Sequence, residues 1–334
     1  MCVATRFVVL LFFNFQVGGS LSTCSQLPMK TKRVSSAGEV LRQCSTYLFD
    51  CDGVLWNSKG VIPGAIALLD RLFELKRNVF LITNNSTKSV EQYSEKCRTL
   101  GLPVSAKNII CSANVAANYL KCQGNFGPIY VVGQSGIGLE LDKCGIAHFG
   151  IGPDQGPDND VFRDIHLKPN TTGVLIGFDE YFNYRKLIKA TSYVCRGLPF
   201  FATNEDAQLP EGDTILPGTG SILASVKYAA GKEPIVMGKP HQPIFDVLRN
   251  QHNIDPDQTL MIGDRLDTDI AFGNRFGMYT ACVLTGVTDS ELLNKVKTDP
   301  GRILHRPTCT FESVQQILEK LNEVENQGAS HPMG

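Results

Sequence analysis

The chain has 334 residues, an apolar share of 43% and a formal net charge of −1. This length exceeds what one hydrophobic core usually serves, so two domains are expected. The near-neutral charge creates no field that would attract nucleic acid or an acidic membrane, so we predict no nucleic-acid partner and no stable membrane association. Eleven cysteines occur without a C-x-x-C motif or a Cys/His cluster, which argues against zinc and favours reduced thiols in the cytoplasm.

Residues 1–40 are expected to lie outside the fold. Arg6 precedes the apolar stretch FVVLLFFNFQV, which is short for a membrane span and is followed by GGS. This order is typical of a targeting signal. However, Met29 opens MKTKRVSSAGEVL, a segment suited to start a soluble protein. We therefore predict either a secretory or organellar signal or an extension absent from the working protein, with the cytoplasm as the expected location.

From residue 46 onward, short apolar runs alternate with segments whose apolar residues recur at helical spacing. In the first half this alternation predicts strands and helices at 46–49, 63–77, 78–83 and 88–101. Near the C-terminus it predicts further elements at 241–251, 259–263, 267–277, 279–286 and 313–321. This order predicts an α/β fold with a doubly wound, Rossmann-like parallel sheet covered by helices on both faces.

Two details of the early helices follow from their residue types. The apolar residues that share one side of the first helix, and that we expect to be buried, are Ile66, Leu69, Leu72 and Phe73. The second helix, at 88–101, is expected to be capped by Ser86 or Thr87 and to end at Gly101.

The stretch between the two halves has strands and helices of its own. They are expected at 129–133, 136–145, 171–178, 184–195 and 199–204. The polar, Gly/Pro-rich segment 150–170 predicts a loop. We therefore predict a core domain made of 41–112 and 214–324, a second α/β domain inserted at 113–213, and a tail at 325–334.

Four groups of polar residues follow predicted strands, at the strand ends where open α/β sheets bind ligands. They are Asp50 and Asp52 in DCDG, Thr83 with the backbone amides of Asn84 and Asn85 in TNNS, Lys239 in GKP, and Asp264, Asp267 and Asp269 in GDRLDTD. Clustered carboxylates suit Mg²⁺, which takes few protein ligands and shares phosphate oxygens. A hydroxyl and amides that enter a helix form an anion cradle. The set therefore predicts phosphoryl transfer, which mainly requires positioning and charge neutralisation.

In this order, DCDGVLW, ITNNS, GKP and GDRLDTD resemble the four motifs of the haloacid dehalogenase superfamily phosphatases. The insert resembles the large α/β cap of that superfamily. GFDEYFNYRKL, ATNEDAQLPEGD and PGTGS are similar to segments of its phosphoglycolate phosphatase, pyridoxal phosphatase and p-nitrophenyl phosphatase family. The resemblance extends from about residue 46 to about residue 321.

The resemblance implies a role for each acidic residue. Asp50 resembles the nucleophile that forms an aspartyl-phosphate and also binds the metal. Asp52 resembles the general acid and base, whose backbone carbonyl joins the metal ligands. Asp264 resembles the third protein ligand of Mg²⁺, and Asp269 a residue that supports the metal and the lysine from behind or through water. Asp267 occupies a position where relatives also carry glutamate, so it is left outside the predicted site.

The remaining residues would handle the phosphoryl group. Lys239 resembles the lysine that neutralises the charge of the nucleophile and of the phosphoryl group. Thr83, together with the amides of Asn84 and Asn85, resembles the clamp that holds phosphate.

Each motif alone also has a structural explanation. Asp-x-Asp-Gly is often a turn, Thr-Asn-Asn-Ser a helix cap, Gly-Lys-Pro an exposed turn, and acids in a first helical turn are common. Two glycine-rich segments are expected to be a turn and the cap of a following helix, respectively, rather than nucleotide sites. VVGQSGIG at 131–138 lacks the G-x-G-x-x-G spacing, and PGTGS at 217–221 lacks the lysine of a P-loop. Cys51 is expected to point away from the two aspartates that flank it.

The core motifs would bind only phosphate and metal, so the insert is expected to select the substrate and to exclude water. Segment 203–213 is expected to be the loop that recognises the organic part of the substrate, called the reading loop below. Its Ala207, Gln208 and Leu209 look like those of phosphoglycolate-type members. The resemblance thus implies a Mg²⁺-dependent phosphomonoester hydrolase for a small phosphorylated metabolite, 2-phosphoglycolate first, with p-nitrophenyl phosphate as a generic substrate. It also implies a homodimer formed through the cap. A pyridoxal phosphate phosphatase, a phosphoprotein phosphatase and a catalytically inactive binding module are the alternatives.

Overall fold

The computed structural model describes residues 36–124, 127–156, 160, 162–209 and 215–329. The apolar N-terminal stretch, on which the targeting prediction depends, lies outside these residues. Within them, no helix combines the length and the apolar character that crossing a membrane requires. Helix α1 (Ala37–Gln43) comes first, and its Val40 and Leu41 are fully buried. The described residues just before 40, the predicted limit of the extension, thus already belong to packed structure.

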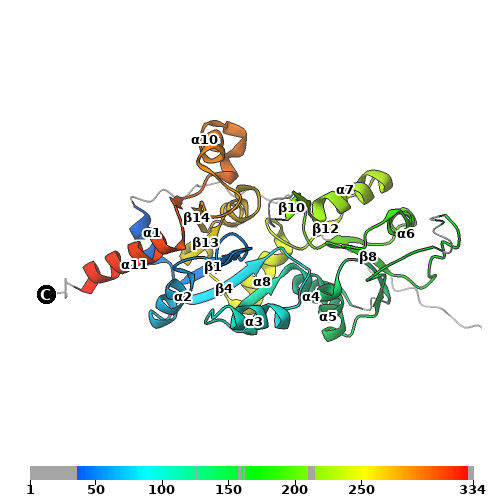
Figure 1. Ribbon diagram of the computed structural model, residues 1–334, viewed down its shortest axis with the longest axis horizontal. Coiled ribbons are helices and arrows are strands. Elements are labelled where there is room, and N and C mark those ends of the chain that lie inside the picture. Colours follow the sequence, from blue (N-terminus) through cyan, green and yellow to red (C-terminus); the bar gives the residue numbers. More distant parts are fainter. Residues whose placement is uncertain (1–35, 125–126, 157–159, 161, 210–214, 330–334) are drawn as a thin grey trace, which may run out of the picture. The chain divides into compact units, whose positions relative to one another are not determined.

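The main sheet has six parallel strands in the order β15-β14-β13-β1-β4-β5 (Figure 1). These strands are β1 (Thr46–Phe49), β4 (Asn78–Thr83), β5 (Ile109–Cys111), β13 (Thr259–Gly263), β14 (Tyr279–Val283) and β15 (Cys309–Phe311). A two-stranded hairpin, β2 (Trp56–Asn57) with β3 (Gly60–Val61), follows the first strand. The central strands lie where the sequence predicts them, because a strand buried on both faces reads as a continuous apolar run.

Helices of the core domain surround this sheet. They are α2 (Ala65–Glu74), α3 (Val90–Thr99), α4 (Ser112–Gln123), α8 (Gln242–His252), α9 (Ala271–Arg275), α10 (Ser290–Thr298) and α11 (Val314–Ala329). Short 3₁₀ segments occur at Ala106–Asn108, Pro256–Gln258 and Pro300–His305. Helix α11 packs against both α1 and α2, so the last described helix holds the first described helix against the core.

Two details of the predicted helices are wrong. In α2, Leu68 is fully buried whereas Ile66 is 37% exposed, because the buried stripe is centred on the side of the helix that holds Leu68, Leu69 and Leu72. Helix α3 is capped by Ser89 rather than by Ser86 or Thr87. Ser89 and Gln92 form a reciprocal capping box, which satisfies more backbone groups than a single upstream hydroxyl could.

A second parallel sheet lies within the inserted region, in the order β12-β9-β8-β6-β7. Its strands and helices are β6 (Ile129–Val132), α5 (Ser135–Lys143), β7 (His148–Phe149), β8 (Gly173–Ile176), α6 (Tyr184–Cys195), β9 (Phe200–Ala202), α7 (Thr219–Ala230) and β12 (Ile235–Val236). A small antiparallel pair, β10 (Gln208–Leu209) with β11 (Leu216–Pro217), accompanies it. A separate inserted sheet beside the six-stranded core sheet confirms the predicted α/β fold class.

The predicted range of the insert, 113–213, ends before two elements whose side chains pack with the inserted sheet. Helix α7 and strand β12 follow residue 213, yet their Ile222, Leu223 and Val236 belong to the apolar core of the inserted sheet. The exact domain boundaries therefore stay a prediction. The described residues of the segment 150–170 contain neither helix nor strand, as expected of a loop.

The glycine-rich segment 131–138 opens helix α5. A Cβ atom on Gly136 would lie 2.5 Å from the backbone of Lys88. This glycine therefore permits close contact between α5 of the insert and the loop that precedes α3 in the core, which explains the glycine without a nucleotide.

Candidate active site

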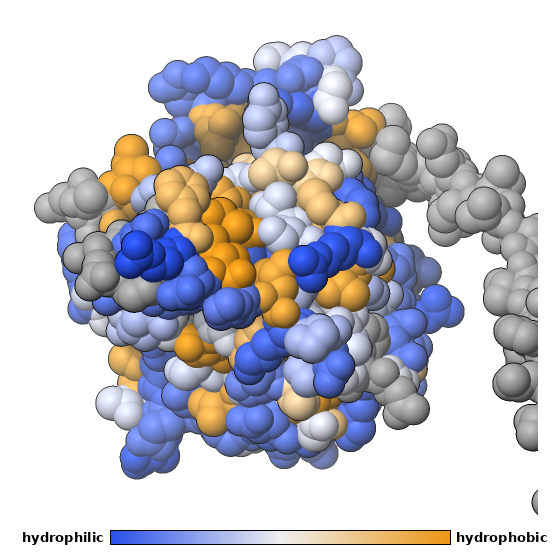
Figure 2. Space-filling model, turned by 90° about the vertical axis from the view of Figure 1, so that its right-hand side faces the viewer, coloured by the Kyte–Doolittle hydropathy of each residue, from blue (hydrophilic) through white to orange (hydrophobic). Residues whose placement is uncertain are grey.

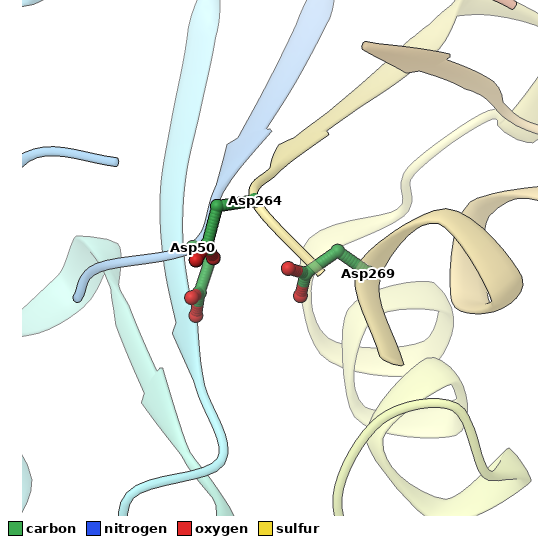
Figure 3. Close-up of side chains that lie close together, drawn as sticks. All are labelled: Asp50, Asp264 and Asp269. Atoms are coloured by element: carbon green, nitrogen blue, oxygen red, sulfur yellow. The ribbon is translucent and has the colours of Figure 1, made fainter. Parts of the chain in front are cut away.

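Three carboxylates meet at one edge of the core sheet. Asp50 follows β1 and Asp264 follows β13, and these strands are paired in parallel through Phe49 and Ile262. Asp269 comes from the π-helical turn Leu266–Ile270 that follows. Figure 3 shows the three side chains pointing toward a common space, and their ligand oxygens all lie within 4.8 Å of one another. This arrangement could hold a metal ion.

Lys239 lies between two of these acids. Its ammonium group donates to Asp50 Oδ1 and to Asp269 Oδ1, both at 2.7 Å, and to the carbonyl of Ile82 at 2.8 Å. The side chain is only 2% exposed. Burial alone would lower the pKa of Lys239, but the charges of Asp269 and Asp50 outweigh it and raise the pKa above its ordinary value. The lysine therefore stays charged and neutralises the acids beside it.

One lysine does not balance three buried acids. Burial, and then the charges of Asp50 and Asp269, raise the pKa of Asp264 well above its ordinary value. Its Oδ2 accepts the backbone N–H of Val287 at 2.7 Å. Within the described part of the chain, its Oδ1 is buried and has no hydrogen-bond partner. An oxygen left without a partner beside surplus negative charge is what a cation would satisfy.

The second motif supplies the end of β4. The amide of Asn85 donates to Thr83 Oγ1 at 3.1 Å, so a ligand phosphate would have to compete with that bond. The Asn84 side chain instead holds the peptide unit of Lys239. Its Oδ1 accepts the Lys239 N–H at 2.8 Å and its Nδ2 donates to the Lys239 carbonyl at 3.0 Å. Asn84 thus fixes the backbone that carries the lysine, a contact the sequence did not predict.

Asn84 also joins the core to the insert. The Asn84 Nδ2 donates to Asp206 Oδ1 at 3.0 Å, and Asn204 Nδ2 donates to the backbone carbonyl of Asn84 at 2.7 Å. Burial raises the pKa of Asp206. Asp206 was missed as a site residue, and the only sequence signal for it is its place within the predicted reading loop 203–213. Through Asn84, that loop is connected to the backbone of the buried lysine.

The other predicted residues are placed as follows. Asp52 is not part of the three-carboxylate cluster, and its side chain is 29% exposed. The Asp267 side chain is 63% exposed and pairs with Arg265; its exclusion from the site stays a prediction. Cys51 is fully buried in the apolar core.

A cavity of about 470 Å³ joins the predicted residues. Those that line it are Asp50, Asp52, Thr83, Asn84, Asn85, Lys239 and Asp264, whereas Asp269 lies behind them against the lysine. The insert contributes Phe178, Glu180, Asn204, Asp206, Gln208 and Leu209 to the same wall. One space therefore contains the acids of the core and the side chains of the inserted domain.

Gly263 determines how closely Asp269 can approach. A Cβ on Gly263 would lie 2.2 Å from Asp269 Cβ, closer than any two such atoms can sit. We expect Gly263→Ala to lower the free energy of unfolding by about 2–3 kcal/mol, as overpacked cores do. Chemical denaturation measures this change. Gly301→Ala is the control, because the nearest atom to its Cβ, Asp299 Oδ1, would lie at 3.3 Å; an equal loss in both variants would contradict the steric explanation.

Comparison with known families agrees with this geometry. Residues 47–147 match a model of haloacid dehalogenase-like hydrolases, and residues 236–315 match a second model described as HAD-hydrolase-like. Together these matches contain every residue of the cluster and of the second motif.

Curated relatives are similar over most of the chain. Glycerol-3-phosphate phosphatase of Gallus gallus is 39% identical over 309 residues, which are 90% of this chain and 97% of the relative. Phosphoglycolate phosphatase 1A of Arabidopsis thaliana, a chloroplastic protein, is 38% identical over 289 residues, 81% of this chain and 78% of the relative.

Solved structures share the fold. The p-nitrophenyl phosphatase of Archaeoglobus fulgidus has a TM-score of 0.72 at 27% identity and covers 83% of this chain and 99% of its own. A glycerol phosphate phosphatase of Mycobacterium tuberculosis, in complex with magnesium, has a TM-score of 0.69 at 25% identity, over 84% of this chain and 77% of its own. The chain therefore belongs to the haloacid dehalogenase-like hydrolases, and within them it is a phosphoric monoester hydrolase of the phosphoglycolate, glycerol-3-phosphate and p-nitrophenyl phosphatase family, as its motifs indicate.

Proposed function

We propose that this chain hydrolyses small phosphorylated metabolites through an aspartyl-phosphate formed on Asp50. The observation that carries the proposal is the contact of Lys239 with both Asp50 and Asp269 at 2.7 Å, beside an oxygen of Asp264 that has no partner among the described residues. A carboxylate is a weak nucleophile, so it needs a nearby positive charge to approach an anionic phosphate ester.

The proposed cofactor is Mg²⁺. Asp50 and Asp264 would hold it through their side chains and Asp52 through its backbone carbonyl, while Asp269 supports Lys239. Once bound, the ion supplies positive charge for the carboxylates and for the phosphoryl oxygens. The magnesium in the Mycobacterium tuberculosis relative supports this choice of metal.

The chain's own residues would perform the two steps. Asp50 forms a bond to phosphorus while the ester P–O bond breaks, and Asp52 gives its proton to the leaving oxygen. Asp52 then takes a proton from water, whose oxygen bonds to phosphorus and releases Asp50 and phosphate. Thr83, with the amides of Asn84 and Asn85, would hold the phosphoryl oxygens, and Lys239 would neutralise their charge.

The preferred substrate is proposed to be 2-phosphoglycolate. Gln208 and Leu209 of the predicted reading loop line the cavity, together with the cationic side chains Lys88, Lys96 and Arg265. Cationic side chains near the phosphate site favour a substrate that carries a second negative charge. Glycerol-3-phosphate, which the names of several relatives suggest, lacks a carboxylate and is the main competitor.

A panel of phosphate esters tests this proposal. It contains 2-phosphoglycolate, glycerol-3-phosphate, pyridoxal phosphate, a phosphopeptide and p-nitrophenyl phosphate, each assayed with Mg²⁺ and with chelator. We expect 2-phosphoglycolate to have the highest kcat/KM among the metabolites. A higher value for glycerol-3-phosphate or pyridoxal phosphate would overturn the substrate, and no turnover of any ester would overturn the proposed activity.

Mg²⁺ is also expected to stabilise the fold. A cation held by buried carboxylates binds only the folded state, so an excess of about 100 times its dissociation constant adds about 2.7 kcal/mol. Thermal unfolding with and without Mg²⁺ measures this gain. We expect Asp264→Asn to abolish it and the control Asp267→Asn, an exposed carboxylate nearby, to retain it. A gain that survives in Asp264→Asn would place the ion elsewhere.

A homodimer formed through the inserted domain remains part of the proposal. Figure 2 shows apolar side chains on the face where α6, α7 and β8 lie in Figure 1. The large apolar residues of the inserted region that are exposed include Phe162, Tyr181, Tyr184, Ile215 and Tyr228. Light scattering measures the mass, and a monomer at every concentration would contradict the dimer.

The cytoplasmic location likewise stays a prediction.

A further inference from the structure

The aspartate proposed as general acid and base has two side-chain partners, one at the end of its own motif and one from a separate helix. Trp56, the only tryptophan of the chain, is 1% exposed and opens strand β2. Its indole Nε1 donates to Asp52 Oδ1 at 2.7 Å. The backbone fixes this contact, because the amide of Gly53 donates to the Trp56 carbonyl at 2.7 Å. The tight turn from 52 to 56 thus holds the indole beside the carboxylate.

The second partner comes from helix α3. Lys96 Nζ lies 3.8 Å from Asp52 Oδ1 and 4.3 Å from the centroid of the Trp56 ring. All three side chains line the same cavity. The capping box of Ser89 and Gln92 fixes the start of this helix. Two segments that are about 40 residues apart in sequence therefore converge on one oxygen of Asp52.

Stability does not explain this convergence well. The side chains of Lys96 and Asp52 are 33% and 29% exposed, and pairs that reach solvent contribute little to folding. A buried indole needs an acceptor for its N–H, but that need would be met by any carbonyl and does not account for the lysine. The common feature of both contacts is that they hold Oδ1 of Asp52.

We propose that Trp56 and Lys96 are positioning residues that orient Asp52 for proton transfer. With Oδ1 held by the indole and the ammonium group, Oδ2 is left to give a proton to the ester oxygen and later to take one from water. This inference rests on the proposed function, since it concerns the residue that moves the proton there. It adds two residues to the proposed mechanism and gives the two oxygens of Asp52 different roles, Oδ1 for orientation and Oδ2 for proton transfer.

The dependence on the leaving group separates this role from a structural one. An alkyl oxygen needs a proton to leave, whereas p-nitrophenolate is stable enough to leave without one. Trp56→Phe keeps the ring beneath Lys96 but removes the N–H. We expect it to lower kcat/KM by about tenfold for glycerol-3-phosphate, an alkyl phosphate with the same charge as p-nitrophenyl phosphate, and by less than about threefold for p-nitrophenyl phosphate. A tenfold loss is a fraction of the roughly 10²- to 10⁴-fold that a general acid contributes.

Lys96→Met gives a second variant that does not alter the buried turn. It is expected to lower kcat/KM more for the alkyl phosphate than for p-nitrophenyl phosphate, with a smaller difference between the two losses than in Trp56→Phe. Its matched control is Lys88→Met, which removes another lysine of the cavity wall. Glycerol-3-phosphate and p-nitrophenyl phosphate carry only the charge of the phosphate group, so loss of one cation weakens the attraction of both equally. Lys88→Met should therefore change the two kcat/KM values by the same factor.

Asp52→Asn separates failure of the inference from failure of the proposed function. It should show the largest gap between the substrates: its loss of kcat/KM for the alkyl phosphate should exceed its loss for p-nitrophenyl phosphate by about 100-fold or more. If Asp52→Asn shows no gap, Asp52 is not the proton donor and the proposed function is wrong at that residue. If Asp52→Asn shows the gap, but Trp56→Phe and Lys96→Met slow both substrates equally, the positioning role is overturned.

Discussion

Replacing Asp50 with asparagine is expected to reduce kcat by about 10⁴-fold or more, the scale seen when a catalytic nucleophile is removed. The amide fills nearly the same volume but has no charge with which to attack phosphorus. The fold should be retained. Burial raises the pKa of Asp50, and two further acids lie beside it, so a neutral amide relieves repulsion in the metal-free protein.

The measurement is kcat for p-nitrophenyl phosphate with Mg²⁺, together with a thermal melt of each variant in chelator. The control is Asp267→Asn, which makes the same chemical change at an exposed acid of the fourth motif. We expect the control to retain activity and Asp50→Asn to lose it without a lower melting temperature. Turnover close to wild type in Asp50→Asn would contradict the proposed nucleophile.

Lys239→Met should affect both stability and activity. Methionine has a similar length, but it leaves Asp50 and Asp269 without the charge that contacts each of them at 2.7 Å. Removing one partner of a buried ion pair costs about 3–5 kcal/mol, and removing a charge that stabilises the transition state slows turnover by about 10²- to 10³-fold. Urea denaturation and steady-state kinetics measure the two effects separately.

A double variant identifies the cause of the stability loss. In Lys239→Met with Asp269→Asn, one unpaired acid is also neutralised, so part of the lost free energy of unfolding should return. Activity should not return, because the phosphoryl group still has no lysine beside it. If the double variant is no more stable than Lys239→Met alone, charge balance is not what the lysine supplies to the fold.

The parts of the site that follow strand ends could be predicted from sequence. Strands β1, β4 and β13 are continuous apolar runs, and in a parallel sheet their carboxyl ends meet at one edge. That rule alone brings Asp50, Thr83 and Asp264 together. Asp269, the third acid of the cluster, does not follow a strand directly. Its place is predicted by its spacing to Asp264 within one motif.

Contacts between distant side chains could not be predicted in this way. Asn84 and Lys239 are 155 residues apart, and no local pattern indicates that one amide side chain pairs with the peptide of the other. The edge strands β5 and β15 have three residues each, too few for a period to appear. By contrast, the capping box of α3 is a local pattern, Ser89 and Gln92 three residues apart, and it takes the place of the expected caps Ser86 and Thr87.

The insert shows a different limit of sequence patterns. Its strands were recognisable, but where the chain returns to the core depends on which sheet β12 joins. That choice is made by pairing with β9, a contact between strands more than 30 residues apart. Local periodicity carries no information about it, and the predicted boundary at 213 stopped before α7 for this reason.

The phosphorylated enzyme offers the most direct test of the central claim. Asp52→Asn should still accept phosphorus from p-nitrophenyl phosphate, whose leaving group needs no proton, yet it should release phosphate slowly because no base activates water. Rapid mixing should show a burst of about one nitrophenolate per chain, and borohydride added during turnover should convert Asp50 to homoserine, as read by peptide mass spectrometry. No burst, or reduction at Asp264 or Asp269 in place of Asp50, would contradict the account.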